Sequence, residues 1–127
     1  SLSTDKVIIT YSDVGNSSYG TAKIGLISGT TLTLGDAYVF SGALTATFNS
    51  NRIAVLSSSK VVVACNGTRS LALISISGSS MNGHLVDYGL GITTNNSYAL
   101  TSVGDSNFII TSLLSLLHML LLWRFSR

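Results

Sequence analysis

The stretch Leu56-Ser57-Ser58-Ser59-Lys60-Val61-Val62-Val63-Ala64 repeats Leu2-Ser3-Thr4-Asp5-Lys6-Val7-Ile8-Ile9-Thr10 at an offset of 54 residues. A third copy, Val103–Thr111, follows the second after 47 residues. Another block, Ile27–Leu32, recurs 49 residues later as Ile76–Met81. Two separate blocks that recur in the same order indicate a tandem repeat.

Within each copy, short β-branched and apolar runs alternate with turn residues, which predicts strands. The strands expected in the first copy are Lys6–Tyr11, Thr21–Ser28, Thr31–Phe40 with an interruption at Gly35-Asp36, and Thr45–Leu56. The second copy predicts Lys60–Cys65, Ser70–Ser77, His84–Tyr88 and Ser97–Val103, and the third begins with Asn107–Thr111. Gly29-Thr30 and Asn82-Gly83 are the expected hairpin turns. Four strands in a repeat of about 50 residues favour a propeller over a sandwich or barrel.

Three segments of the first copy resemble tandem propeller-type repeats of large, mostly uncharacterised surface or secreted proteins: Tyr11–Ala22, Ile27–Thr31 and Tyr38–Phe40. The resemblance covers about residues 2–111 and is weaker in the second copy, where Cys65-Asn66-Gly67 replaces the Tyr-Ser-Asp turn. It implies a fold and a location outside the cell, and it brings no catalytic residues.

The resemblance also implies a phase for the repeat, because a propeller blade runs from an inner strand a to an outer strand d. Residues 45–56 would form strand a of a blade, followed by b, c and d. The chain then holds about two and a half blades, whereas closed propellers need about four to eight. Open edges must be covered by another copy, by further sequence or by the C-terminal tail. The expected fold is all-β, with incomplete propeller-like antiparallel four-stranded repeats over residues 1–111.

The repeat pattern stops at Thr111, and residues 112–127 form a leucine-rich tail. Seven leucines lie between Leu113 and Leu122, and leucine favours helices, so we expect an apolar C-terminal helix. Three interpretations stay open: a membrane helix, a soluble helix that caps the open sheet edge, or the tail of a truncated or frameshifted gene. The membrane interpretation depends on the uncharged run of 16 residues from Phe108 to Trp123. Its candidate membrane residues are Phe108, Leu113, Leu117, Leu121 and Trp123.

Composition and charge exclude several classes of protein. Charged residues are 9% of the chain, and Glu, Gln and Pro are absent, so a soluble helical bundle is not expected. The apolar content of 46% is too high for intrinsic disorder. The net charge of +2 comes entirely from Arg124 and Arg127, because the remaining basic and acidic residues balance. A neutral body predicts no nucleic-acid partner.

The sequence contains no recognisable catalytic or metal-binding motif, so we expect no enzyme activity and no cofactor. The single cysteine, Cys65, sits in an apolar run and is expected to be buried. An enzyme would have to assemble its site from Asp13, Asp87 and His84 on separate loops. Asp13 stands alone among turn residues, which favours a structural turn over a calcium loop.

Three N-glycosylation sequons occur in predicted turns, at Asn16, Asn66 and Asn95. They suit a protein displayed outside the cell, although a chain rich in Ser, Thr and Asn also contains sequons by chance. The first functional hypothesis is a non-enzymatic binding or adhesion module, tethered to a membrane by its tail, that uses its loops as the contact surface. The alternatives are a structural subunit that assembles through open sheet edges into a ring or filament, and a gene fragment without its own function. The ligand is not indicated.

Overall fold

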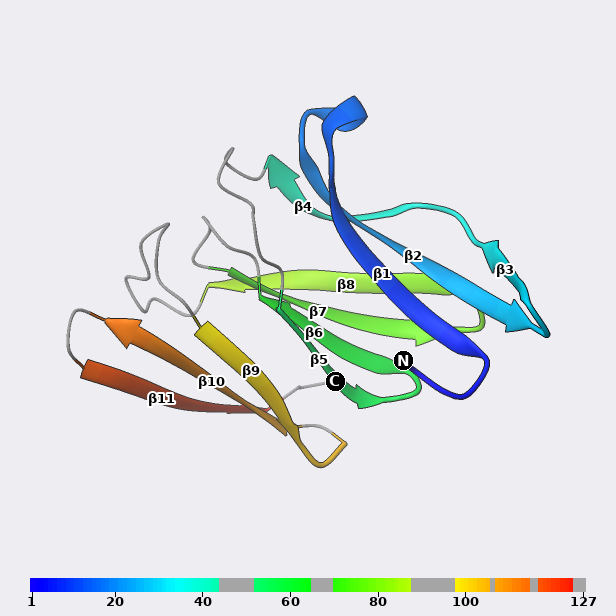
Figure 1. The fold of residues 1–127 in the computed structure, drawn as a ribbon. Coiled ribbons are helices and arrows are strands. Elements are labelled where there is room, and N and C mark those ends of the chain that lie inside the picture. The colour runs from blue at the N-terminus through cyan, green and yellow to red at the C-terminus, as the bar shows by residue number, and fades with distance from the viewer. Residues whose placement is uncertain (44–51, 65–69, 88–97, 106, 115–116, 125–127) are drawn as a thin grey trace.

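A computed structural model describes residues 1–43, 52–64, 70–87, 98–105, 107–114 and 117–124 (Figure 1). These residues form strands and one 3-10 turn, η1 (Val14–Asn16), and contain no α-helix. The strands are β1 (Lys6–Asp13), β2 (Tyr19–Ser28), β3 (Thr31–Leu34), β4 (Tyr38–Ala43), β5 (Arg52–Ser57), β6 (Lys60–Ala64), β7 (Ser70–Ser77), β8 (Ser80–Asp87), β9 (Tyr98–Val103), β10 (Asn107–Leu114) and β11 (Leu117–Arg124). The prediction of an all-β fold is confirmed.

The strands form three antiparallel sheets, and most neighbours in a sheet are consecutive in the chain. Sheet A contains β1, β2 and β3, with β4 also paired to β2. Sheet B is the four-stranded meander β5-β6-β7-β8, and sheet C is β9-β10-β11. The described strands do not close into a ring, so the propeller-like arrangement of the sheets stays a prediction.

The first recurring sequence block contains the start of one strand in each of the three sheets. β1, β6 and β10 start at Lys6, Lys60 and Asn107, which are the aligned positions of the first block. The second block contains the β2–β3 and β7–β8 turns, where Gly29 and Gly78 have φ values of +58° and +62°. A glycine with positive φ at the first position of a two-residue hairpin loop is typical of a type II′ turn.

The structure agrees with one predicted interruption of the strands and disagrees with one predicted turn. The interruption expected at Gly35-Asp36 is present, because β3 ends at Leu34 and β4 begins at Tyr38, while the Gly35 N–H donates to the Ile24 carbonyl oxygen at 2.8 Å. The turn expected at Asn82-Gly83 is wrong. These residues lie inside β8, paired with Ser75 and Ile74, because Gly78 already makes the turn.

Sheet A packs face to face on sheet B around one hydrophobic core. Side chains in a strand alternate between the two faces of its sheet, so each strand contributes every second residue. The buried members of this core are Leu2, Ala22, Ile24, Phe40, Val61, Val63, Ala72, Ile74 and Ile76. Because Ile24, Val61 and Ile74 are fully buried, this interface contains much of the apolar surface removed from water.

Sheet B is also buried on its second face. Six further residues of sheet B are 6% exposed or less and do not belong to the core shared with sheet A: Ala54, Leu56, Val62, Ala64, Leu71 and Leu73. β5 contacts β9 of sheet C on this side of sheet B (Figure 1), and Phe108 of β10 is fully buried. Sheet B is therefore the middle layer of a stack, between sheet A and sheet C, and sheet C contacts it mainly through β5.

The helix expected over residues 112–127 is not observed. Instead, β10 continues to Leu114 and β11 runs back beside it, with Phe108 opposite Trp123 and Leu113 opposite His118. Of the candidate membrane residues, Phe108 and Leu113 lie in β10, and Leu117, Leu121 and Trp123 lie in β11. The physical reason is tertiary context: leucine's helix preference is worth only tenths of a kcal/mol per residue. Pairing with β10, which is itself paired to β9, outweighs it.

The C-terminal tail was also the segment expected to form a membrane helix. No helix among the described residues has the length and apolar character needed to cross a lipid bilayer. The tail instead continues the sheet pattern of the preceding copies, because β11 follows β10 as β7 follows β6.

Candidate functional site

The turn between β1 and β2 carries the first sequon. Ser18 donates its N–H to the Asp13 carbonyl oxygen at 2.8 Å, and the Ser12 hydroxyl donates to the Ser18 carbonyl oxygen at 3.2 Å. Ser17 and Ser18 have φ values of +54° and +60°, an uncommon conformation for residues with a Cβ atom. This closed turn leaves Asn16 exposed at the tip of sheet A. Its amide is therefore accessible as a glycosylation acceptor; Asn66 and Asn95 lie outside the described residues.

The acidic residues and histidine considered for catalysis come from different sheets. Asp13 ends β1 in sheet A, whereas His84 and Asp87 belong to β8 in sheet B. The Asp13 carboxylate lies close to Gly15, since a Cβ atom there would be 3.4 Å from its Oδ1 atom. In the described part of the chain, no group of three or more His, Cys, Asp and Glu residues could hold a metal ion. Cys65 lies outside this part.

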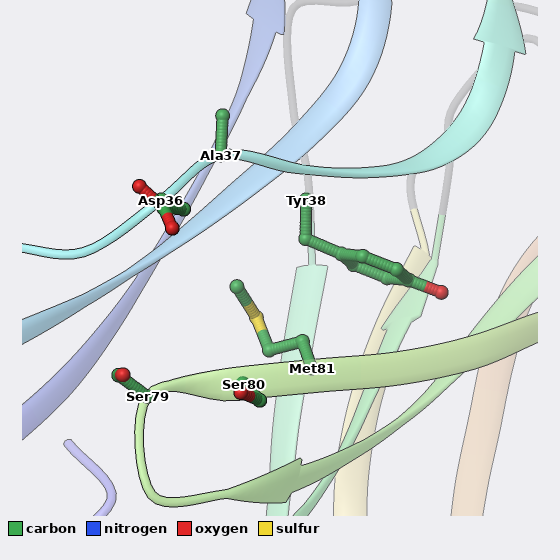
Figure 2. A pocket seen from close by; sticks show the side chains of 6 residues that line it. All are labelled: Asp36, Ala37, Tyr38, Ser79, Ser80 and Met81. Carbon is green, nitrogen blue, oxygen red and sulfur yellow. The ribbon is translucent and has the colours of Figure 1, made fainter.

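One small pocket lies where sheet A meets the β7–β8 turn (Figure 2). Asp36, Ala37 and Tyr38 line it from sheet A, and Ser79, Ser80 and Met81 line it from sheet B. Figure 2 shows the Met81 side chain rising from β8 toward the segment that contains Ala37. The cavity volume of about 210 Å³ is below the roughly 300–1,000 Å³ typical of small-molecule sites. The pocket suits a few water molecules better than an organic ligand.

Sheet A has an apolar surface on the side that faces away from sheet B. Strand register places its members opposite one another: Val7 with Gly25, Gly25 with Leu34, and Ile27 with Leu32. We call this surface the outer face of sheet A and define it by Val7, Ile9, Ile27, Leu32, Leu34 and Val39. All except Val7 are between 37% and 50% exposed. A contiguous exposed apolar surface of this kind is typical of an interaction site.

The side chains of the outer face gather around Gly25. A Cβ atom on Gly25 would lie 2.8 Å from Cδ1 of Leu32 and 2.9 Å from Cγ2 of Val7, so these side chains cover the glycine. Lys23 is the charged residue of this face, opposite Ile9 in the register, and it is half-buried. The outer face is therefore apolar, with one lysine in its central strand β2.

Comparisons with known proteins name no relative. No protein-family model matches the chain, and neither the curated proteins nor the solved structures include a significant match.

The sequence pattern did not predict the outer face of sheet A. Alternation along β2 places Ala22, Ile24 and Leu26 on one face and Lys23 and Gly25 on the other. Leu26 is 45% exposed although it shares this face with Ala22 and Ile24, which are fully buried. The missed signal is that β1 carries apolar residues on both faces, because Val7, Ile8 and Ile9 are consecutive. Leu32 and Leu34 of β3 add an apolar residue at every second position.

Proposed function

We propose that this chain is a non-enzymatic β-repeat module that acts outside the cell as a rigid scaffold for binding or adhesion. The observation that carries this proposal is the double burial of sheet B between two similar antiparallel sheets. Stacked repeats of this kind build stiff scaffolds whose turns project from the ends and carry recognition. The exposed turn around η1 is the described contact element at one end of sheet A.

The location outside the cell is supported by composition and by the sequon turn. The chain is rich in Ser and Thr, has 9% charged residues, and presents Asn16 on an exposed tip. Expression behind a secretory leader in eukaryotic cells tests accessibility of this acceptor. We expect a glycosidase-sensitive product whose mobility shift decreases in Asn16→Gln. A secreted protein with the same mobility for wild type and Asn16→Gln would contradict the use of this site.

Binding by the turns is tested with immobilised chain and a panel of purified polysaccharides and matrix proteins. The test variant is Val14→Ser, which changes the most exposed large apolar side chain of the η1 turn, at 83% exposure. Its control is Ser58→Ala in the β5–β6 turn of sheet B, which lies at the opposite end of the strands from the η1 turn (Figure 1). Saturable binding that is weakened by Val14→Ser alone supports the proposal. No saturable binding to any member of the panel, or equal binding by both variants, counts against recognition by this turn.

A second candidate function is a structural subunit that assembles with copies of itself. The outer face of sheet A favours it, because a soluble monomer has no evident use for a sheet face with six apolar residues.

A further inference from the structure

The exposed and buried faces of sheets A and B occupy equivalent positions. The offset of 54 residues aligns Val7 and Ile9 of β1 with Val61 and Val63 of β6. Val61 and Val63 are fully buried and belong to the core covered by sheet A, whereas Ile9 is 37% exposed. In β1, the outer face of sheet A thus repeats apolar positions that sheet B keeps covered.

The second strand and its hairpin extend this equivalence. The offset of 49 residues aligns Ile27 with Ile76 and Leu32 with Met81. Ile76 is 6% exposed and Met81 packs against the same core, whereas Ile27 and Leu32 are 39% and 50% exposed. The apolar character is retained at these positions although nothing in the described chain covers them.

Sheet C, at the opposite end of the stack, exposes the type of face that packs against the inner side of a neighbouring sheet within the chain. Sheet A covers sheet B with Leu2 and Ile8, which align with Leu56 and Val62 of sheet B and with Val103 and Ile109 of sheet C. Leu2 and Leu56 are 7% and 6% exposed, but Val103 is 42% exposed. Sheet A therefore turns the face with Leu2 and Ile8 toward sheet B, and sheet B turns the equivalent face toward sheet C. No further sheet among the described residues covers the equivalent face of sheet C, which we call the outer face of sheet C.

We infer that the outer face of sheet A binds the outer face of sheet C of a second copy of this chain, head to tail. The contact would continue the A-on-B and B-on-C packing seen within one chain, and this continuity identifies the occupant. The inference deepens the second candidate function and rests on the stacked-sheet scaffold, but it does not depend on recognition by the η1 turn. Because the two surfaces differ, repeated contacts generate a ring or an open filament rather than an isologous dimer.

Lys23 sets the strength of this contact. Its equivalent in sheet B is Ala72, which is 1% exposed under sheet A. An ammonium group in a covered sheet face must reach solvent along the stem of its own side chain or lose hydration. Docking on the outer face is therefore weaker than the packing of sheet A on sheet B, and Lys23→Ala strengthens it.

Sedimentation velocity over a range of concentrations tests the inference. Wild type is expected to associate in a concentration-dependent manner, and Leu32→Lys to weaken association about 10- to 100-fold, the value of one buried leucine. Leu85→Lys is the matched control, because Leu85 is 44% exposed but belongs to β8 of the middle sheet. Leu34→Lys, at 49% exposure, provides a second test variant. Circular dichroism melting verifies that each variant is folded.

A mixing experiment distinguishes head-to-tail contact from other arrangements. Leu32→Lys blocks the outer face of sheet A, and Val103→Lys blocks the outer face of sheet C. Each variant alone should fail to form large assemblies, whereas the equimolar mixture should form a 1:1 dimer through the one intact pair of faces. A monomeric wild type, equal association by Leu32→Lys and Leu85→Lys, or a mixture that stays monomeric overturns the inference. These results leave the panel-binding test unaffected, so the two proposals can fail separately.

Discussion

The hydroxyl of Tyr38 in β4 donates a hydrogen bond to the carbonyl oxygen of Gly83 in β8 across a distance of 3.2 Å. Tyr38 belongs to sheet A and Gly83 to sheet B, so this bond joins the two packed sheets at the strands where β4 contacts β8. The ring of Tyr38 also packs against the shared core. Tyr38 therefore contacts sheet B through both its ring and its hydroxyl group.

Replacing Tyr38 with Phe should lower the free energy of unfolding by about 0.5–1.5 kcal/mol, because the ring remains but the inter-sheet hydrogen bond is lost. Urea titration monitored by circular dichroism measures the change. Tyr11→Phe, a half-buried tyrosine in β1, is the control. An equal effect of the two substitutions would contradict a specific role for the Tyr38–Gly83 bond.

Gly83→Ala should destabilise the protein by about 1–3 kcal/mol, the usual cost of overpacking. A Cβ atom at Gly83 would lie 2.5 Å from the Leu73 carbonyl oxygen and 3.2 Å from Cα of Ile74, and neither backbone atom can move alone. Gly25→Ala is the matched comparison, because its Cβ atom would meet the ends of the Val7 and Leu32 side chains, which can rotate. Thermal melting should give the lower midpoint for Gly83→Ala, and the reverse order would refute this account of β8.

Ile24→Ala should cost about 2–5 kcal/mol, because Ile24 is fully buried between sheets A and B. Leu26→Ala, two residues away on the same strand, should cost less than about 1 kcal/mol, since Leu26 is 45% exposed. Equilibrium denaturation measures the free energy of unfolding of the two variants, which compares a buried and an exposed position on the same side of one strand. Similar losses would show that the end of β2 is more deeply covered than the structure indicates.

Phe108→Ala should cost about 3–5 kcal/mol, because the Phe108 side chain is fully buried in β10. This variant tests whether sheet C packs on the stack. It also distinguishes two hypotheses for β10, namely a strand packed in a soluble fold and a membrane segment. The matched control is Val103→Ala at 42% exposure in the neighbouring strand. If Phe108→Ala leaves the detergent-free protein as stable as wild type, the packing of β10 against sheet B is wrong.

Local patterns predicted the two central strands of the middle sheet well. β7 spans Ser70–Ser77 as expected, and β6 begins at Lys60, because β-branched and apolar runs bounded by turn residues have few alternatives to a strand. The Gly29 hairpin was also predictable, since glycine is favoured where φ is positive.

The wrong predictions are those in which long-range packing overrides a local preference. The tail after Thr111 has a helical composition, and only the first part of its partner strand β10 was predicted. A strand that forms because a neighbouring strand pairs with it cannot be predicted from its own local sequence. Asn82-Gly83 has the composition of a turn, yet Gly83 is needed in β8 because that strand passes close to the backbone of β7. The outer face of sheet A could not be predicted from the sequence, because the sequence does not show which side of sheet A packs on sheet B.

The double burial of sheet B also determines how the protein tolerates change over evolutionary time. Val61, Val62 and Val63 are all fully buried, so three consecutive positions of β6 reject polar replacements. The equivalent residues of β1 are half-buried or exposed, and they lie in a terminal layer. Variation between natural versions of this chain should therefore be concentrated in the outer layers, and the middle layer should accumulate only swaps among valine, isoleucine and similar residues.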